Sequence, residues 1–195
     1  MTGKGSLNHN SRKFHAKNSD PNRTHWNVEY CNEDIKDVYH ELFDDALKRY
    51  NDKQTRKDRK IDDYYEKIRS GKQEKLFHEV ILQIGDKDNM GSETMEGQLA
   101  AKILDEYMKG FQERNPTLRV FAAHLHLDEA TPHLHIDFIP YVTGSKRGLD
   151  TRVSLKQALS SLGFKGGSRS ETELNQWVQS EKQKLAMVMR ENEIE

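Results

Sequence analysis

The sequence predicts an α+β fold with a central antiparallel β-sheet and flanking α-helices. Apolar residues recur every three or four positions in some segments, whereas β-favouring residues alternate or cluster in others. In addition, the predicted strands 118–127 and 133–142 are separated by only a short turn. A connection this short pairs the two strands antiparallel, because parallel neighbours need a longer crossover.

Helices are expected where apolar side chains fall on one face at helical spacing. The first covers 33–50, where acidic residues in the first turn favour the positive end of the helix dipole. The others are expected over 55–69, over 93–114, from 154 to 163, and from 170 towards the C-terminus. Ser170 and Glu173 have the spacing of a capping box, which predicts the start of the last helix.

Two further strands complete the expected sheet. Residues 23–31 alternate aromatic or aliphatic side chains with polar ones, and residues 76–84 (LFHEVILQI) are rich in β-favouring types. Residues 1–22 are rich in Asn, Ser, Gly and Lys, which predicts an irregular N-terminal arm. We therefore expect an arm over 1–22, a core over 23–165, and a C-terminal helix over 166–195 that leads into a further C-terminal region.

Composition indicates one ordinary domain with its own core, since the chain has 195 residues. The single Cys31 cannot form an internal disulfide, and no apolar run is long enough to span a membrane. The expected location is the cytoplasm. The net charge of -1 argues against a nucleic-acid-binding protein, but basic residues cluster locally over 12–23, 53–60 and 146–152.

The segment 124–140 (HLHLDEATPHLHIDFIP) carries most of the chemical information. Alternate side chains of a strand share a face, so His133 and His135 point the same way, opposite to the apolar residues between them. Antiparallel pairing with the preceding strand brings His126 against them. Three imidazoles that converge with one side open are typical of a metal site with room for a substrate. Asp128 and Glu129, in the turn, are expected to accept hydrogen bonds from the far sides of these rings.

Several motifs resemble those of a known family. Residues 126–135 (HLDEATPHLH) closely resemble the signature of the MobV-type mobilisation relaxases, also called the Mob/Pre or plasmid recombination family. Residues 9–12 (HNSR) resemble the HNxR motif of that family. The segments 20–30 and 77–84 resemble the stretches that accompany these motifs, in the same order. The resemblance therefore covers most of the chain.

This resemblance implies the HUH-endonuclease fold, a relaxase catalytic core over 23–165, and strand-specific nicking of origin-of-transfer DNA, single-stranded or supercoiled. The enzyme would remain on the 5′ phosphate. The resemblance assigns a divalent ion to His126, His133 and His135, which is Mn²⁺ or Mg²⁺ in the family. Imidazole ligands suit softer ions than Mg²⁺, so Mn²⁺ is preferred, with Zn²⁺ as an adventitious occupant.

The same resemblance makes His9 the nucleophile, because a neutral imidazole can attack phosphorus. Arg12 would then steady a phosphate, and Glu129 would accept the proton of His9 or orient its ring. The competing nucleophiles are the seven tyrosines, Tyr30, Tyr39, Tyr50, Tyr64, Tyr65, Tyr107 and Tyr141. The expected DNA contacts combine basic and aromatic side chains, namely Arg12, Arg23, Trp26, Lys146 and Arg147.

Three alternatives stay open. A rolling-circle replication initiator or a transposase of HUH type would use the same chemistry for another task. A metal-stabilised DNA-binding module without catalysis is disfavoured, because structural metals usually have four protein ligands. A zinc hydrolase acting on small substrates leaves the HNSR motif unexplained. A homodimer formed through the further C-terminal region, and contact with conjugation coupling machinery, are additional expectations about partners.

Overall fold

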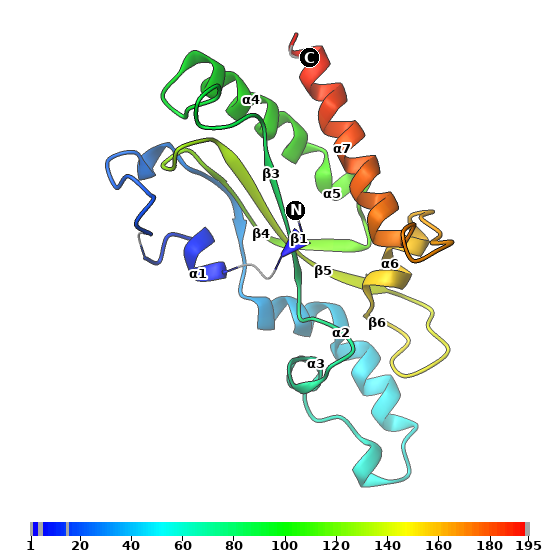
Figure 1. Ribbon diagram of the computed structural model, residues 1–195. Coiled ribbons are helices and arrows are strands. Elements are labelled where there is room, and N and C mark those ends of the chain that lie inside the picture. Colours follow the sequence, from blue (N-terminus) through cyan, green and yellow to red (C-terminus); the bar gives the residue numbers. More distant parts are fainter. Residues whose placement is uncertain (1, 4–5, 15, 194–195) are drawn as a thin grey trace.

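The computed structural model describes residues 2–3, 6–14 and 16–193, and it shows the predicted antiparallel α+β fold (Figure 1). The strands are β1 (Thr2–Gly3), β2 (Val28–Asn32), β3 (His78–Gln83), β4 (Leu118–His126), β5 (His133–Val142) and β6 (Arg152–Val153). Their order across the sheet is β1-β3-β5-β4-β2, and β6 pairs with β5. Every strand pair is antiparallel. The strand order places β4 and β5, which carry the clustered histidines, next to each other near the centre of the sheet.

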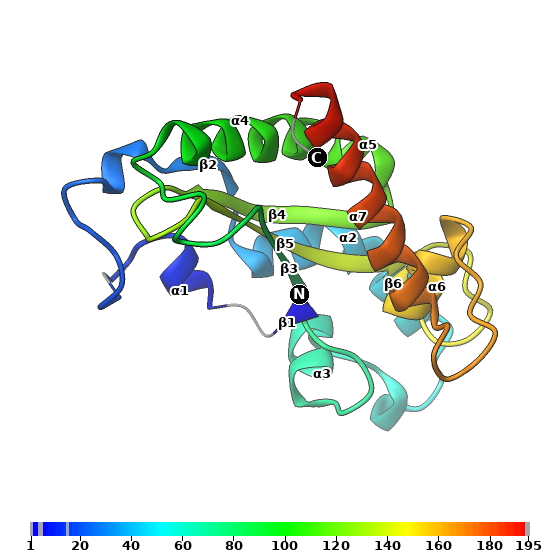
Figure 2. The same ribbon diagram turned by 45° about the horizontal axis from the view of Figure 1, so that its top comes forward.

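One face of the sheet is covered by the later helices (Figure 2). They are α4 (Met95–Lys109), α5 (Phe111–Arg114), α6 (Leu155–Ser161) and α7 (Glu173–Glu191). The main core lies between these helices and the strands, and Trp177 of α7 is fully buried in it. The last helix therefore packs onto the same core as the sheet.

Two groups of helices cover the opposite face of the sheet. The helices α2 (Ile35–Asp52) and α3 (Tyr64–Ser70) form a second core on β4 and β5, around Phe43, Phe121 and Ile139. The short helix α1 (Leu7–Asn10) approaches β4 at the end where the histidines lie. A β-bulge between Val120 and Ala122 changes which side chains of β4 face the main core. Beyond the bulge Ala123 and Leu125 face that core, so His124 and His126 face the other way.

Several predicted boundaries were wrong. The expected helix 55–69 is a 3₁₀ turn at Lys57–Arg59 followed by α3, because Asp63 rather than Thr55 caps the helix. The expected helix 93–114 is interrupted at Gly110. Thr172 caps α7 by accepting a hydrogen bond from the Asn175 amide, so the capping box at Ser170 does not form. At Asp63 and Thr172 a polar side chain accepts a hydrogen bond from a free N–H group in the first turn of the helix, whereas α5 begins after Gly110 without a side-chain cap.

The N-terminal segment differs most from its prediction. It was expected to be irregular over 1–22, yet it contains β1 and α1, and a 3₁₀ turn at Thr24–Trp26 precedes β2. Residues 1, 4, 5 and 15 of the arm, and residues 194 and 195 of the last segment, lie outside the described residues. Among the described residues, no helix combines the length and apolar character needed to cross a bilayer.

Candidate metal centre

The three histidines of β4 and β5 form a compact, buried cluster. His126 lies opposite His133 in the strand register, and His135 is the next residue on the same face of β5. The ring centroids are 5.2 Å apart for His126 and His133, 4.8 Å for His126 and His135, and 4.9 Å for His133 and His135. The structure therefore brings together the rings that the sequence placed on one face of two strands.

Hydrogen-bond partners assign the protonated nitrogen of each ring. His126 donates from Nε2 to the carbonyl oxygen of Asn10 at 2.8 Å, and His133 donates from Nδ1 to the carbonyl oxygen of Thr131 at 2.9 Å. His135 donates from Nδ1 to Glu79 Oε1 at 2.7 Å. The lone pairs that remain are therefore those of His126 Nδ1, His133 Nε2 and His135 Nε2.

These lone pairs lie in two overlapping groups of donor atoms that could each hold a cation, one with His126 and His133 and the other with His126 and His135. His126 Nδ1 and His133 Nε2 are 3.4 Å apart, and His135 Nε2 is buried without a hydrogen-bond partner among the described residues. Burial lowers the pKa of His126 to about 2 and also lowers the pKa of His133, so both rings stay neutral near pH 7. Neutral imidazole is the form that binds metal ions. Donor atoms of His126, Glu129 and His133 lie within 4.8 Å of one another, as do those of His9, His126 and His135.

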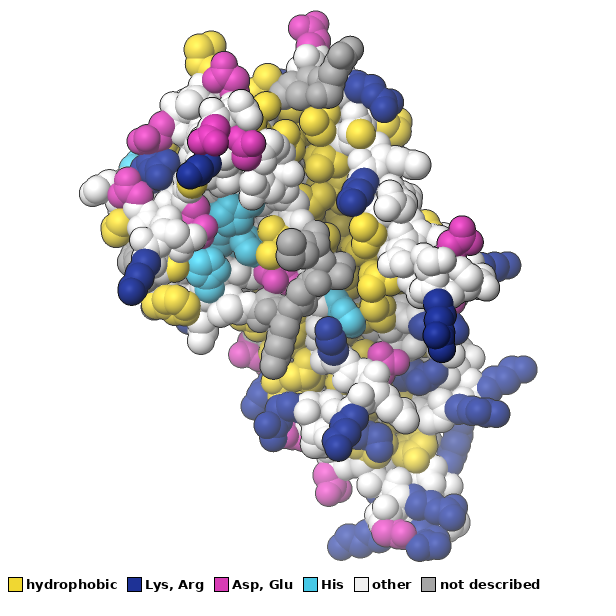
Figure 3. Space-filling view, viewed as in Figure 1, with side chains coloured by type: hydrophobic (Ala, Val, Ile, Leu, Met, Phe, Trp, Pro, Cys, Tyr) yellow, Lys and Arg dark blue, Asp and Glu magenta, His cyan; other side chains and the backbone are white. Residues whose placement is uncertain are grey.

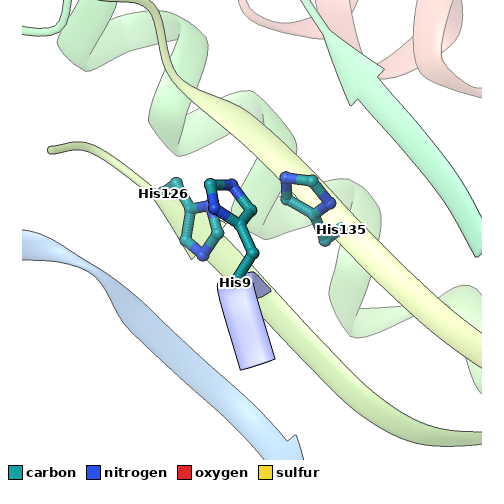
Figure 4. Close-up of side chains that lie close together, drawn as sticks. All are labelled: His9, His126 and His135. Carbon is teal, nitrogen blue, oxygen red and sulfur yellow. The ribbon is translucent and has the colours of Figure 1, made fainter. Parts of the chain in front are cut away.

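His9 reaches this cluster from α1 (Figure 4). Its ring centroid is 5.8 Å from that of His126 and 6.2 Å from that of His135. Burial and the nearby Arg12 guanidinium lower the pKa of His9, which favours the neutral ring. Arg12 Nη1 lies 3.2 Å from His9 Nε2, and Glu129 Oε1 lies 3.4 Å from the same nitrogen.

Arg12 is held by the two acidic residues of the β4–β5 turn. Its Nε and Nη2 donate to Asp128 at 2.9 and 2.6 Å, and Nη2 also donates to Glu129 Oε1 at 2.8 Å. Asp128 is fully buried; burial alone would raise its pKa, but Arg12, Asn27 and Thr24 lower it to about 2. The expectation that Asp128 would support a histidine was wrong, because its hydrogen bonds anchor the arm.

The carboxylate that supports a histidine is Glu79 of β3, which the sequence analysis did not single out. Asn10 donates to Glu79 Oε1 at 2.8 Å and to Asp137 Oδ2 at 3.0 Å, and all three side chains are buried. Burial raises the pKa of Asp137 to about 7, and the neighbouring Glu79 charge adds to this effect. The signal for Asp137 was present, because it shares strand parity with His133 and His135.

None of the seven tyrosines contacts the histidine cluster within the described part of the chain. Several hydroxyls are used elsewhere: Tyr39 donates to the carbonyl of Leu76, Tyr64 accepts from the amide of Val153, and Tyr107 donates to Glu181. Tyr64 packs with Phe43 in the second core, at 4.9 Å between ring centroids. The paired tyrosines at 64 and 65 therefore serve packing.

The five expected DNA contacts do not form one surface. Arg12 lies in the histidine centre, and Arg23 pairs with Asp20 at 3.3 Å. Trp26 is exposed, with 41% of its surface accessible, and follows the arm into β2. Lys146 and Arg147 belong to the loop after β5, whereas the histidines are at the start of that strand. At about 3.3 Å per residue, the ten residues of β5 separate them by about 30 Å.

Comparison with known proteins connects this geometry to a family. The Mob_Pre family, described as plasmid recombination enzyme, matches residues 4–186. Two Mn-bound crystal structures of the MobM relaxase domain (MOBV; Mob_Pre) with plasmid pMV158 oriT DNA, at pH 5.5 and pH 4.6, each have a TM-score of 0.52 and 23% identity. They cover 97% of this chain, which spans 79% and 80% of theirs. No curated protein sequence matches. The chain has the fold of a mobilisation relaxase domain and belongs to the Mob_Pre family of plasmid recombination enzymes.

Proposed function

We propose that this chain is the relaxase of a mobilisable plasmid or related mobile element. It nicks one strand of origin-of-transfer DNA and remains joined to the new 5′ phosphate. The observation that carries the proposal is the position of the neutral His9 ring beside three buried histidines with free lone pairs. Membership of the plasmid recombination enzyme family, and the oriT DNA bound by the MobM relaxase domain, support this substrate.

In the proposed reaction, His9 Nε2 attacks the scissile phosphorus. A nitrogen–phosphorus bond forms while the bond to the 3′ oxygen breaks, and the 3′ oxygen leaves and takes up a proton from water. The attacking Nε2 carries no proton, so His9 loses its Nδ1 proton to solvent once the nitrogen–phosphorus bond has formed. Glu129 Oε1, 3.4 Å from Nε2, orients the ring together with Arg12. Arg12 occupies the Nε2 lone pair in this structure. A DNA phosphate that draws the guanidinium towards itself frees that lone pair for attack.

His126, His133 and His135 are the proposed metal ligands, and Glu129 is near enough to His126 and His133 to contribute an oxygen. A divalent cation held there would neutralise a non-bridging phosphate oxygen and would stabilise the more negative transition state. The three imidazoles favour Mn²⁺ over Mg²⁺, because nitrogen donors suit softer ions. Mn is the ion in the related MobM structures. Glu79 and two backbone carbonyls accept hydrogen bonds from the far nitrogens of these rings, so the nitrogens that would face the cation carry no proton.

Cleavage of supercoiled plasmid carrying the cognate origin tests the proposal. We expect nicking with Mn²⁺, less with Mg²⁺, and none with EDTA. The 5′ adduct should be absent from His9→Ala and present in each single Tyr→Phe variant. An N–P linkage is also labile to mild acid, whereas a tyrosyl phosphodiester survives it. Adduct that forms in His9→Ala and resists acid would contradict the assignment of His9.

Family membership does not favour the rolling-circle initiator, the transposase, the non-catalytic module or the small-substrate hydrolase. Contacts of Arg12, Arg23, Trp26, Lys146 and Arg147 with DNA remain part of the proposal. Dimerisation, contact with coupling machinery and a cytoplasmic location also remain predictions, as does the division into an arm, a core and a C-terminal helix.

A further inference from the structure

Asn10 attaches the N-terminal arm to the centre of the sheet. Its side chain is 1% exposed, and its amide nitrogen donates to Glu79 on β3 and to Asp137 on β5. These strands are neighbours, so a single amide group bridges two buried carboxylates. An amide with two N–H donors is suited to this position, because a residue without them would leave both carboxylates facing each other unscreened.

The same residue reaches two of the proposed metal ligands. The carbonyl oxygen of Asn10 accepts the Nε2 proton of His126 at 2.8 Å. The oxygen of Glu79 that Asn10 contacts, Oε1, also accepts the Nδ1 proton of His135 at 2.7 Å. The arm therefore keeps the His126 proton off the nitrogen that faces His133. Through Asn10 the arm also holds the Glu79 carboxylate in place, and this carboxylate keeps the His135 proton on Nδ1 and leaves Nε2 free.

If the arm leaves, His126 loses the acceptor that fixes its tautomer. The proton is then free to occupy Nδ1, which is the nitrogen that faces His133 Nε2. Glu79 loses one of its two hydrogen-bond donors. Partners of this kind change metal affinity by about 10- to 100-fold in other metal sites.

We propose that Asn10 couples docking of the His9-bearing arm to loading of the metal centre. The docked arm selects the tautomers that bind the cation, and by thermodynamic reciprocity the cation stabilises the docked arm. Asn10 is a positioning residue, since it acts through His126 and Glu79. The inference rests on the proposed function, because it takes these histidines as the metal ligands. It implies that a bound metal strengthens the hold on the nucleophile.

Two measurements on the whole chain test the coupling. The first is the Mn²⁺ dissociation constant, from the electron paramagnetic resonance signal of free Mn²⁺. It is determined for the wild type, Asn10→Ala, Asn8→Ala and His135→Ala. Asn8 is the matched control, since it lies on the same helix but is exposed. We expect Asn10→Ala to weaken Mn²⁺ binding at least about tenfold, Asn8→Ala to leave it unchanged, and His135→Ala to abolish tight binding.

The second measurement is amide hydrogen exchange in the segment 6–14, with and without Mn²⁺. The α1 hydrogen bonds Asn10 N to Ser6 O and Ser11 N to Leu7 O report on docking. We expect Mn²⁺ to slow exchange in the wild type and in Asn8→Ala, and to have little effect in Asn10→Ala. The wild-type comparison alone tests whether the metal and the docked arm are coupled, even if Asn10→Ala does not fold.

The outcomes separate the coupling from the metal centre itself. If Asn10→Ala binds Mn²⁺ as the wild type does, or if Mn²⁺ leaves exchange of the wild-type arm unchanged, the coupling is wrong and the metal site stands. If His135→Ala binds Mn²⁺ as tightly as the wild type, the proposed ligands are wrong and the coupling falls with them. An Asn10 with a purely structural role would alter exchange of the arm equally with and without Mn²⁺.

Discussion

His126 Nδ1 lies 3.4 Å from His133 Nε2, and the partners on the far side of each ring leave both nitrogens without a proton. Two lone pairs held face to face repel each other, and burial keeps either ring from acquiring a proton near neutral pH. The folded chain therefore carries an electrostatic cost at this point, which a cation removes.

Mn²⁺ should accordingly stabilise the folded protein. A ligand that binds only the folded state contributes about 2.7 kcal/mol at a concentration 100 times its dissociation constant. For a chain of this size we expect a rise in Tm of about 5–10 °C, measured by differential scanning calorimetry with and without EDTA. His126→Ala should show no Mn²⁺-dependent rise, whereas Asn8→Ala should behave as the wild type. A Tm that is independent of Mn²⁺ in the wild type argues against the site.

The Arg12–Asp128 pair should be far more important for stability than the exposed ion pairs. Asp128 is fully buried and Arg12 nearly so, with Nη2 2.6 Å from Oδ1. Removing one partner of a buried pair costs about 3–5 kcal/mol when the other charge is left uncompensated. Glu129 still pairs with Arg12 after Asp128→Ala, so this substitution should lower the free energy of unfolding in urea by somewhat less, about 2–3 kcal/mol. In the exposed pair Lys48–Asp52, Lys48→Ala should leave this free energy unchanged within the error of the measurement, because water screens the two charges. Equal effects of the two substitutions would show that Asp128 does not anchor the arm.

The face of the strand on which each histidine lies could be predicted from the sequence, because it depends only on the alternation of neighbouring residues. The alternation in 124–126 and 133–137, together with a short turn, places His126, His133 and His135 on one face. The bulge at Phe121 did not disturb this prediction, because it lies before the histidines and the alternation beyond it is regular.

Contacts between distant segments could not be predicted in this way. Glu79 supports His135 only because β3 pairs with β5, and that strand order depends on packing of the whole chain. Asp128 was assigned to a histidine because it is close in sequence, but Arg12 competes for it from 116 residues away. The arm appeared irregular because α1 has only four residues and is held mainly by tertiary hydrogen bonds.

Stability should also fall in mildly acidic solution because of His78. The His78 ring, in β3, stacks on Phe138 of β5, and burial lowers the pKa of His78 to about 4. The unfolded chain, with a pKa near 6.5, then binds more protons than the folded chain between pH 4 and 6.5. The His78 contribution is therefore complete above pH 6.5 and is lost as the pH falls towards 4.

His78→Phe tests this prediction, since it keeps an aromatic ring against Phe138 without a titratable group. As the pH falls from 7 to 4, the wild type should lose about 3 kcal/mol of unfolding free energy relative to His78→Phe. His40→Phe serves as the control, because His40 is exposed on α2 and its pKa is raised by Asp44. Parallel pH curves for wild type and His78→Phe would show that His78 is not the cause.

DNA that extends beyond the nick should contact a basic lobe formed by residues 48–75 and 143–153. Residues 48–75 contain eleven Lys and Arg but six Asp and Glu, in a chain with a net charge of -1. Lys and Arg gather over α2 and α3 in Figure 3, away from the histidines. Four basic residues, Lys67, Lys72, Arg147 and Arg152, line a cavity of about 620 Å³ there. Each phosphate contact by duplex DNA contributes about 0.9 to the slope of log affinity against log salt.

Lys57, Arg59 and Lys60 are exposed in this lobe and have no acidic partner in the described part of the chain. Replacing all three by Ala should reduce the salt slope for a long origin duplex by about 2 to 3, measured by fluorescence anisotropy from 50 to 300 mM NaCl. Binding of a short single-stranded oligonucleotide around the nick should change little, because it does not reach the lobe. The matched triple variant of Lys182, Lys184 and Arg190 on α7 removes the same charge elsewhere. If both triple variants reduce the slope equally, the effect comes from net charge and the lobe has no specific role.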